Sequence, residues 1–308
     1  MTRKPFSFWR GARHQRALVH RRLRRWPAPV HGMLWTVCSG ICFAFLNTFT
    51  RALSQQLDPY EAQFLRYLMG GLVMLPWVWR QGWAAYKPVN VLGQFWRGAV
   101  HTLGLILWFT ALPHIPLADM TAIGFTSPIF IMLGAAWFLG EPMRRDRWIA
   151  ALFGFVGVLV VVLPKMTGSG GIYNLVMLAS APVFAASFLI TKALTRYEKT
   201  SVIVLWQAIT VTVLSLPMAL WHWQTPNPWQ WLGFAATGVF GSLGHYCLTR
   251  AFRSADISAT QSLRFLDLVW ASLMGWLVFG DSSSASTWAG AFVILLATVW
   301  IARRESRR

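Results

Sequence analysis

Residues 98–125 read GAVHTLGLILWFTALPHIPLADMTAIGF, and residues 238–265 read GVFGSLGHYCLTRAFRSADISATQSLRF. When the two stretches are laid over each other without a gap, glycines fall on glycines and one phenylalanine falls on another. The clearest matches are Gly98 with Gly238, Gly104 with Gly244, and Phe125 with Phe265. Self-similarity at a fixed offset, here 140 residues, indicates an internal repeat.

The repeat extends on both sides of this stretch. Downstream, Gly140-Glu141 falls on Gly280-Asp281 at the same offset. Upstream, residues 51–54 fall on residues 192–195 at an offset one residue larger. We therefore divide the chain into a tail of residues 1–31, a first unit of residues 32–164 and a second unit of residues 172–303.

The composition predicts that both units lie in a membrane. Hydrophobic types make up 56% of the 308 residues and charged types only 12%, about half the charged share of a soluble protein. The apolar residues form ten runs of roughly 17–23 residues, each near the ~20 that cross a bilayer as a helix. No stretch between them is long enough for a soluble domain. The runs are residues 32–52, 60–79, 93–112, 118–139, 147–164, 172–193, 201–221, 232–251, 257–279 and 286–302.

The charge distribution predicts the orientation of these runs. All but four of the 28 Lys and Arg fall in the tail, in alternate connections with their helix ends, or at the C-terminus. Because cytoplasmic segments retain Lys and Arg during insertion, we expect both termini in the cytoplasm. The net charge of +18 is thus explained by topology, and we expect no nucleic-acid partner. The basic tail is interpreted as a topology determinant that contacts anionic headgroups; a regulatory arm is the alternative.

Five runs in each unit fix the relation between the units. Two copies of a unit with an odd number of spans must enter the membrane in opposite directions. This predicts an all-α membrane protein of ten transmembrane helices in two inverted five-helix repeats. Inverted repeats are typical of secondary transporters, in which a midplane site opens to alternate sides.

Ionisable residues inside the runs are the first candidates for a substrate path, because a charge in hydrocarbon is costly unless it faces the bundle interior. Gln261, Arg264 and Asp267 recur every three residues of the ninth run, so they share one broad helix face. Arg264 and Asp267 are able to pair. They either line the substrate path or tie two helices together as a structural ion pair.

Arg66 lies about six residues into the second run. Its side chain either snorkels to the outer interface or pairs with Glu61 or Asp58. We assign Arg66 and Glu61 to a gate or an ion pair.

Four further residues are candidates for the cavity. His245 follows Gly241 on a small, polar stripe of the eighth run, and His101 lies one turn after Arg97 in the third run. Either histidine is able to carry a proton near neutral pH, so a coupling proton is possible, although either could instead be a packing residue. Asn47 lies deep in the first run, and Trp108 is placed to stack on a planar solute or to pack.

Other chemistry is not indicated. The sequence lacks the H-E-x-x-H, Walker and G-x-S-x-G motifs, so we expect no enzyme activity. The cysteines Cys38, Cys42 and Cys247 all fall inside runs without a nearby His or carboxylate, which favours packing over a metal site or a disulfide. We expect no metal and no cofactor.

Several motifs resemble the EamA branch of the drug/metabolite transporter superfamily. They are residues 116–130 (PLADMTAIGFTSPIF), Leu139-Gly140-Glu141, the GFVGVLVVV stretch that starts at Gly154, and the segment from Pro59 to Arg80 with Glu61 and Arg66. The second unit departs from this pattern: Asp267-Leu268 stands where the family usually has a proline such as Pro128, and Asp281 replaces the usual glutamate.

The resemblance implies a central cavity built largely from the first, third, fourth, sixth, eighth and ninth spans. It also implies multi-pass insertion in the cell inner membrane. Members with the same PLAD-type segment include proteins assigned to riboflavin or S-adenosylmethionine uptake, while others export amino acids. We therefore expect a transporter of a small organic metabolite that works by alternating access. A non-transporting membrane scaffold or a lipid-interacting protein is the alternative.

Overall fold

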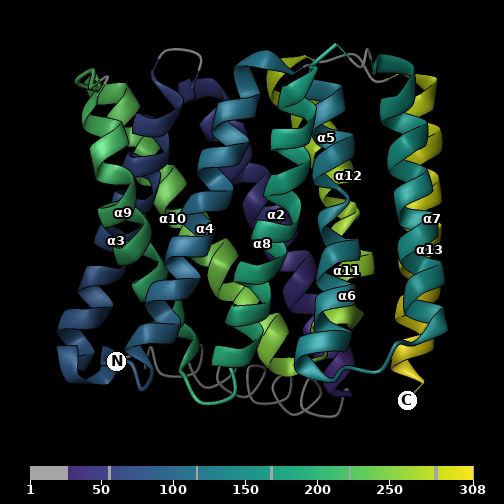
Figure 1. The fold of residues 1–308 in the computed structure, drawn as a ribbon, viewed down its shortest axis with the longest axis horizontal. Coiled ribbons are helices and arrows are strands. Elements are labelled where there is room, and N and C mark those ends of the chain that lie inside the picture. Colours follow the sequence, from purple (N-terminus) through teal and green to yellow (C-terminus); the bar gives the residue numbers. More distant parts are fainter. Residues whose placement is uncertain are drawn as a thin grey trace, which may run out of the picture.

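The computed structural model describes residues 27–54, 57–115, 117–166, 169–221, 223–280 and 284–307. Every regular element in these ranges is helical (Figure 1), which confirms the predicted all-α class. The basic tail up to residue 26 and Asp281 of the repeat lie outside the described residues.

The described helices follow the ten predicted spans in order, and two of those spans are broken. The first unit contains α2 (Ala28–Ser54), α3 (Pro59–Gln81), α4 (Val91–Ala111), α5 (Leu117–Gly124), α6 (Ser127–Leu139) and α7 (Arg145–Val162). The second unit contains α8 (Ile172–Leu194), α9 (Thr200–Trp221), α10 (Pro228–Ser254), α11 (Ile257–Arg264), α12 (Leu266–Phe279) and α13 (Ala285–Ser306). Short 3₁₀ helices are η1 (Trp83–Tyr86), η2 (Leu112–His114) and η3 (Leu163–Lys165).

Six helical stretches of the described chain are long and apolar enough to cross a membrane, which supports a multi-pass membrane protein. They are Ala28–Leu53, Met120–Leu139, Ile172–Leu194, Thr200–Trp221, Ile257–Phe279 and Ala285–Ser306. The other predicted spans correspond to α3, α4, α7 and α10. These helices are less apolar because they carry polar side chains that the bundle buries, among them Glu61, Arg97 and Arg147.

The fourth and ninth predicted spans break at repeat-equivalent places. In the fourth span, Pro128 lacks an N–H for the helix ladder, and the Thr126 hydroxyl donates to the carbonyl of Ile123 at 2.6 Å. The ninth span breaks at Phe265, between α11 and α12, without a proline. The rings of Phe125 and Phe265 stack with centroids 5.8 Å apart. Contact between two equivalent residues is expected where a twofold relation between repeats has its axis.

Two pairs of equivalent helices pack antiparallel. Arg147 at the start of α7 bonds Glu305 at the end of α13 at 2.9 Å. Farther along α7 the two backbones come close together, because a Cβ added to Gly290 of α13 would lie 2.4 Å from the carbonyl oxygen of Gly157. Likewise, α3 and α9 are equivalent and in contact. Glu61 near the start of α3 accepts from the backbone N–H of Gln224, beyond the end of α9.

The first helix of each unit packs on the other unit. Helix α2 contacts α10, α11 and α12 of the second unit, and α8 contacts α4, α5 and α6 of the first. The two sets are related by the repeat, because α10, α11 and α12 are the counterparts of α4, α5 and α6. The units are therefore interleaved, and neither forms a separate globule (Figure 1).

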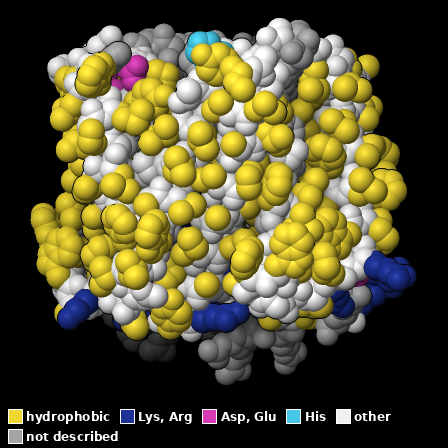
Figure 2. Space-filling view, viewed as in Figure 1, with side chains coloured by type: hydrophobic (Ala, Val, Ile, Leu, Met, Phe, Trp, Pro, Cys, Tyr) yellow, Lys and Arg dark blue, Asp and Glu magenta, His cyan; other side chains and the backbone are white. Residues whose placement is uncertain are grey.

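The outer surface matches a protein embedded in lipid. In Figure 2, hydrophobic side chains cover the visible face in a broad band, and Lys and Arg gather along one edge of it. We call this end of the bundle the basic end. It contains the start of α7 and the ends of α8 and α13, and its basic residues include Arg144, Arg147, Lys192 and Arg303.

Substitution of Gly290 by alanine should separate α7 from α13. The added methyl would overlap backbone of Gly157, which has no rotamer to escape through, and overpacking of this kind costs about 1–3 kcal/mol. We expect a lower melting temperature for Gly290→Ala in detergent. The matched control is Gly71→Ala, whose Cβ would lie 3.8 Å from Ala208 in ordinary contact. Equal melting temperatures for the two variants would contradict the close helix approach.

Candidate functional site

Two of the predicted histidines meet in the bundle interior through a tyrosine. The Tyr67 hydroxyl lies 2.8 Å from Nε2 of His101 and 3.5 Å from Nε2 of His245. The two imidazole centroids are 5.8 Å apart. Tyr67 and His101 are buried and His245 is partly buried. Helices α3, α4 and α10 thus bring these side chains together from both units.

The hydrogen bonds of this group form a chain in which each hydrogen has an acceptor. If Tyr67 donates to Nε2 of His101, the Nδ1–H of His101 donates to the Ser187 hydroxyl, 3.3 Å away on α8. Ser187 in turn donates to the backbone carbonyl of Arg97 at 3.3 Å. Nε2–H of His245 is then the donor to Tyr67. The chain therefore passes through four side chains whose polar hydrogens are able to reverse direction.

Arg97 lies one turn from His101 and is fully enclosed. Its guanidinium donates to the Thr191 hydroxyl at 2.5 Å, to the Ile203 carbonyl at 2.9 Å and to Oε1 of Gln207. Arg97 lies near the start of α4, and three acceptors from α8 and α9 hold its side chain inside the bundle at 2% exposure.

Arg264 and Asp267 form the predicted ion pair at the break of the ninth span. Their side chains are 3.0 Å apart and keep 22% and 25% exposure. Asp267 also lies close to α2, since a Cβ on Gly40 would be 2.5 Å from its Oδ1. The pair is therefore partly accessible, unlike the sealed Arg97.

A single aromatic ring separates the pair from the histidines. The Arg264 guanidinium lies 5.5 Å from the centroid of the Phe188 ring, and the His101 ring lies 6.3 Å from the same ring. Phe43 packs edge-on against His245 at 5.1 Å. The two polar groups are thus neighbours across an apolar partition.

The remaining predicted site residues lie elsewhere. Gln261 is fully buried, and its amide nitrogen donates to Ile257 and Thr260 of its own helix. Trp108 packs edge-on against Phe109 at 4.8 Å within an apolar cluster. Asn47 is exposed on the face of α2 that also carries Gly40 and Arg51, both of which contact α12.

Arg66 and Glu61 have separate partners. The Arg66 guanidinium lies over the Tyr67 ring, 4.8 Å from its centroid. Glu61 is buried and accepts from the backbone N–H of Gln224 at 3.0 Å. Arg66 also lines a small, partly open cavity with Tyr67, Gln207 and His245. Helices α3 and α9, the second and seventh predicted spans, were not among the spans that the resemblance assigned to the cavity.

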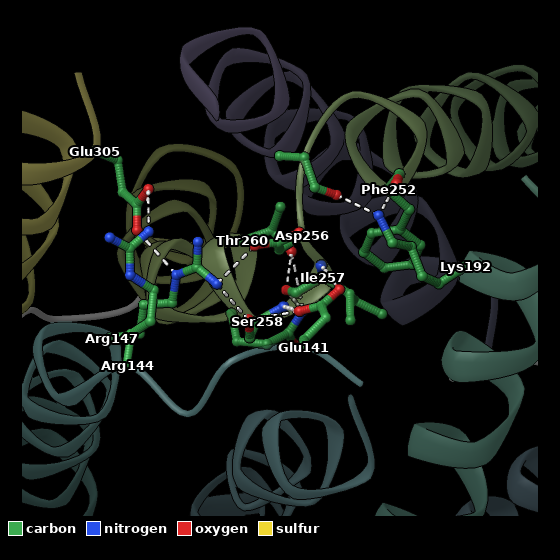
Figure 3. A network of polar contacts seen from close by, with 12 residues as sticks. Glu141, Arg144, Arg147, Lys192, Phe252, Asp256, Ile257, Ser258, Thr260 and Glu305 are labelled. Atoms are coloured by element: carbon green, nitrogen blue, oxygen red, sulfur yellow. Dashed lines mark hydrogen bonds and ion pairs between the residues drawn. The ribbon is translucent and has the colours of Figure 1, made fainter. Parts of the chain in front are cut away.

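A second polar network lies at the basic end (Figure 3). Glu141, at the end of α6, accepts from the backbone N–H groups of Ile257 and Ser258 at 2.7 and 3.0 Å. The Ser258 hydroxyl also donates to Glu141 at 2.6 Å. A carboxylate that receives the first N–H groups of a helix is favoured by the helix dipole. Glu141 therefore ties the first unit to the start of α11.

Buried charges extend this network across the same end. Arg147 bonds Glu305 at 2.9 Å and Asp256 at 3.0 Å. Lys192, at the end of α8, donates to the carbonyls of Phe252 and Ala255. These contacts join the ends of α8, α10 and α13 to the starts of α7 and α11 at the basic end.

Sequence reasoning missed Tyr67, Arg97 and Glu305. The signals were present but weak: Tyr67 adjoins Arg66, Arg97 precedes His101 by one turn, and Glu305 is an acidic residue within a basic terminal run. Their partners come from helices far away in sequence, which spacing along one helix does not reveal.

Comparison with protein-family models matches residues 30–163 and 171–303 to the EamA-like transporter family. A riboflavin transporter of Rhizobium johnstonii is 35% identical over 282 residues, covering 91% of this chain and 93% of the relative. An S-adenosylmethionine uptake transporter of Rickettsia felis is 29% identical and covers 90% of this chain and 94% of the relative.

Two further similarities are informative. The pseudopaline exporter CntI of Pseudomonas aeruginosa is 29% identical and covers 89% of this chain and 96% of the relative. A solved crystal structure has a TM-score of 0.77 at 17% sequence identity and covers 90% of this chain and 98% of that one. At this identity, the crystal structure supports the fold alone.

Replacement of Tyr67 by phenylalanine should leave Nε2 of His101 without its partner in a buried site. Loss of one partner of a buried hydrogen bond costs about 1–3 kcal/mol, so we expect Tyr67→Phe to melt at a lower temperature. Tyr60→Phe is the control, because the Tyr60 hydroxyl bonds Thr110 at 3.0 Å in a partly exposed position that water is able to reach. A larger loss in the control would contradict the buried chain.

Replacement of Arg147 by glutamine should remove the short ion pair of the Glu305 carboxylate, which is 1% exposed, and leave it a longer contact with Arg144 at 3.8 Å. Breaking a buried pair in this way costs roughly 3–5 kcal/mol. Arg145→Gln removes an exposed arginine from the same helix turn and should be near neutral. The two melting temperatures, measured side by side in detergent, decide whether this network holds the basic end together.

Proposed function

Since this chain belongs to the EamA-like transporter family, we propose that it is a secondary transporter that moves a small organic metabolite by alternating access. The observation that carries the proposal is a polar interior, shared by both units, in which an ion pair and a histidine chain face each other across Phe188. Polar groups of this kind inside a membrane bundle mark substrate and ion paths.

The topology that we propose has ten spans in two inverted five-helix repeats, residues 32–164 and 172–303, in the cell inner membrane. The antiparallel contacts of α7 with α13 and of α3 with α9 support the inversion. The positive-inside rule puts the basic end, both termini and the tail of residues 1–31 in the cytoplasm. In this state the network around Glu141 and Arg147 closes the cytoplasmic end.

Within this scheme the candidate residues have different roles. Arg264 and Asp267 meet the solute first, because they keep about a quarter of their surface exposed. Asn47 lines the approach along α2, and His101 and His245 lie beyond Phe188. Gln261, Trp108 and Glu61 support the surrounding helices, and Arg66 lines the adjoining cavity.

The chain that joins His245, Tyr67, His101 and Ser187 is the proposed route for a coupling proton. Histidine is the side chain whose ordinary titration lies near physiological pH. Riboflavin and S-adenosylmethionine are the first solutes to test, because the names of two relatives specify them.

A scaffold without transport would have no need for an ion pair that its neighbours leave partly uncovered within the spans. The partial exposure of Asp267 therefore favours the transporter over the scaffold.

Purified protein in liposomes should take up at least one solute of a panel of riboflavin, S-adenosylmethionine and amino acids. Asp267→Asn should reduce uptake about tenfold or more, because Arg264 is then left uncompensated in the path. Arg303→Gln, an exposed change at the end of α13, is the control and should transport normally.

The same liposomes test proton coupling. A pH gradient should accelerate uptake by the wild type and should have no effect on His245→Gln. Absence of flux for every solute, with Asp267→Asn and wild type indistinguishable, would contradict the proposed function.

A further inference from the structure

A small, partly open cavity lies beside Arg66. Helices α2, α3, α9 and α10 enclose it, and its polar lining includes Arg66, Gln207, Ser242 and His245. It is contributed by both units.

Arg66 brings an uncompensated positive charge to this cavity. Within the described part of the chain, no carboxylate lies in ion-pair contact with its guanidinium. The nearest acidic candidate in sequence, Glu61, is occupied by the backbone N–H of Gln224. The guanidinium contacts Tyr67, whose ring centroid lies 4.8 Å away. A charge inside a membrane bundle without a counter-charge is costly.

The opposite wall of the cavity adds to the positive potential. Gln207 accepts from Arg97 through its oxygen, and its amide nitrogen, a group that only donates, lies in hydrogen-bond contact with Tyr67. The acceptors of Arg97 are themselves neutral, namely Thr191, the Ile203 carbonyl and Gln207. Ser242 does not add a donor, because its hydroxyl hydrogen is directed to the Gly70 carbonyl at 3.0 Å.

The other arginine of the polar interior does not share this property. Arg264 is paired with Asp267 at 3.0 Å, so its positive charge is already balanced without an anionic ligand. The excess of positive charge is therefore confined to the side of the interior formed by α3, α4 and α9.

We propose that this cavity is an anion subsite, in which Arg66 binds a carboxylate or phosphate group of the transported solute. A guanidinium binds either group through two parallel hydrogen bonds. The proposal rests on the proposed function and narrows its substrate class to organic anions and zwitterions. Under this proposal Arg66 binds the solute, and it is neither a gate residue nor part of an internal ion pair.

The test uses pairs of probes that differ in one anionic group. Full-length protein in phosphatidylcholine nanodiscs is titrated with riboflavin 5′-phosphate against riboflavin, and with indole-3-acetate against indole-3-acetamide. The wild type should bind the anionic member of at least one pair about tenfold or more tightly than its neutral partner, as a charge-assisted hydrogen-bond pair requires.

Arg66→Gln should abolish that preference. Arg80→Gln is the matched control, because Arg80 lies in the last turn of the same helix and is exposed; it should keep the preference. Arg66→Gln should also melt at the wild-type temperature or above, since it removes an unpaired charge. A clear drop in its melting temperature would indicate an internal counter-charge and would overturn the proposal.

Two further arms separate the alternatives. If phosphatidylglycerol in the nanodisc competes with the anionic probe, and only when Arg66 is present, the anion subsite stands and a lipid headgroup is its occupant. If the wild type binds both members of each pair equally, or binds neither, the subsite is refuted. Liposome flux of neutral riboflavin without any anion preference would refute the subsite and leave the transporter proposal intact. Arg66-dependent anion binding without flux of any solute would refute the transporter proposal and leave the subsite intact.

Discussion

The exchange of first helices between the two units is the constraint on which the rest of the structure depends. Because α2 packs on α10, α11 and α12, and α8 packs on α4, α5 and α6, each unit buries its apolar surface only in the presence of the other. This interleaving brings helices of both units around one interior. It also sets equivalent elements against each other, as in the stacking of Phe125 on Phe265. The polar groups that support a transport function exist as a site only after this association.

The distribution of polar groups then divides the molecule into three levels. At the basic end, buried ion pairs, the Lys192 hydrogen bonds and the Glu141 cap join six helices. In the middle, the partly exposed Arg264–Asp267 pair is separated from the histidine chain by the ring of Phe188. Beside that chain, Arg66 and Arg97 supply positive charge without carboxylate partners. In hydrocarbon these groups must satisfy one another or bind a solute, because no water competes for them. Rocking the units about the breaks of the fourth and ninth spans would rearrange all three levels together.

Much of this was predictable from the sequence, and the remainder depended on contacts between distant segments. Composition and the 140-residue repeat predicted an all-helical membrane protein of two related units, and the spacing of Arg264 and Asp267 predicted their pair. The family resemblance was also confirmed. The break at Phe265 was not predictable, because no proline or glycine marks it. Nor was the enclosure of Arg97, whose acceptors come from α8 and α9. The roles of the candidate residues in transport remain predictions.

The central claim is that the two units cross the membrane in opposite directions around a shared interior. Asp58 and Lys199 are equivalent positions, each directly preceding the second helix of its unit, α3 and α9. Single cysteines at these positions, in a variant in which Cys38, Cys42 and Cys247 are replaced by serine, should therefore face opposite sides. In intact cells, a membrane-impermeant maleimide should label the cysteine at 58 and should reach the one at 199 only after the cells are opened. Labelling of both from the same side would contradict the account.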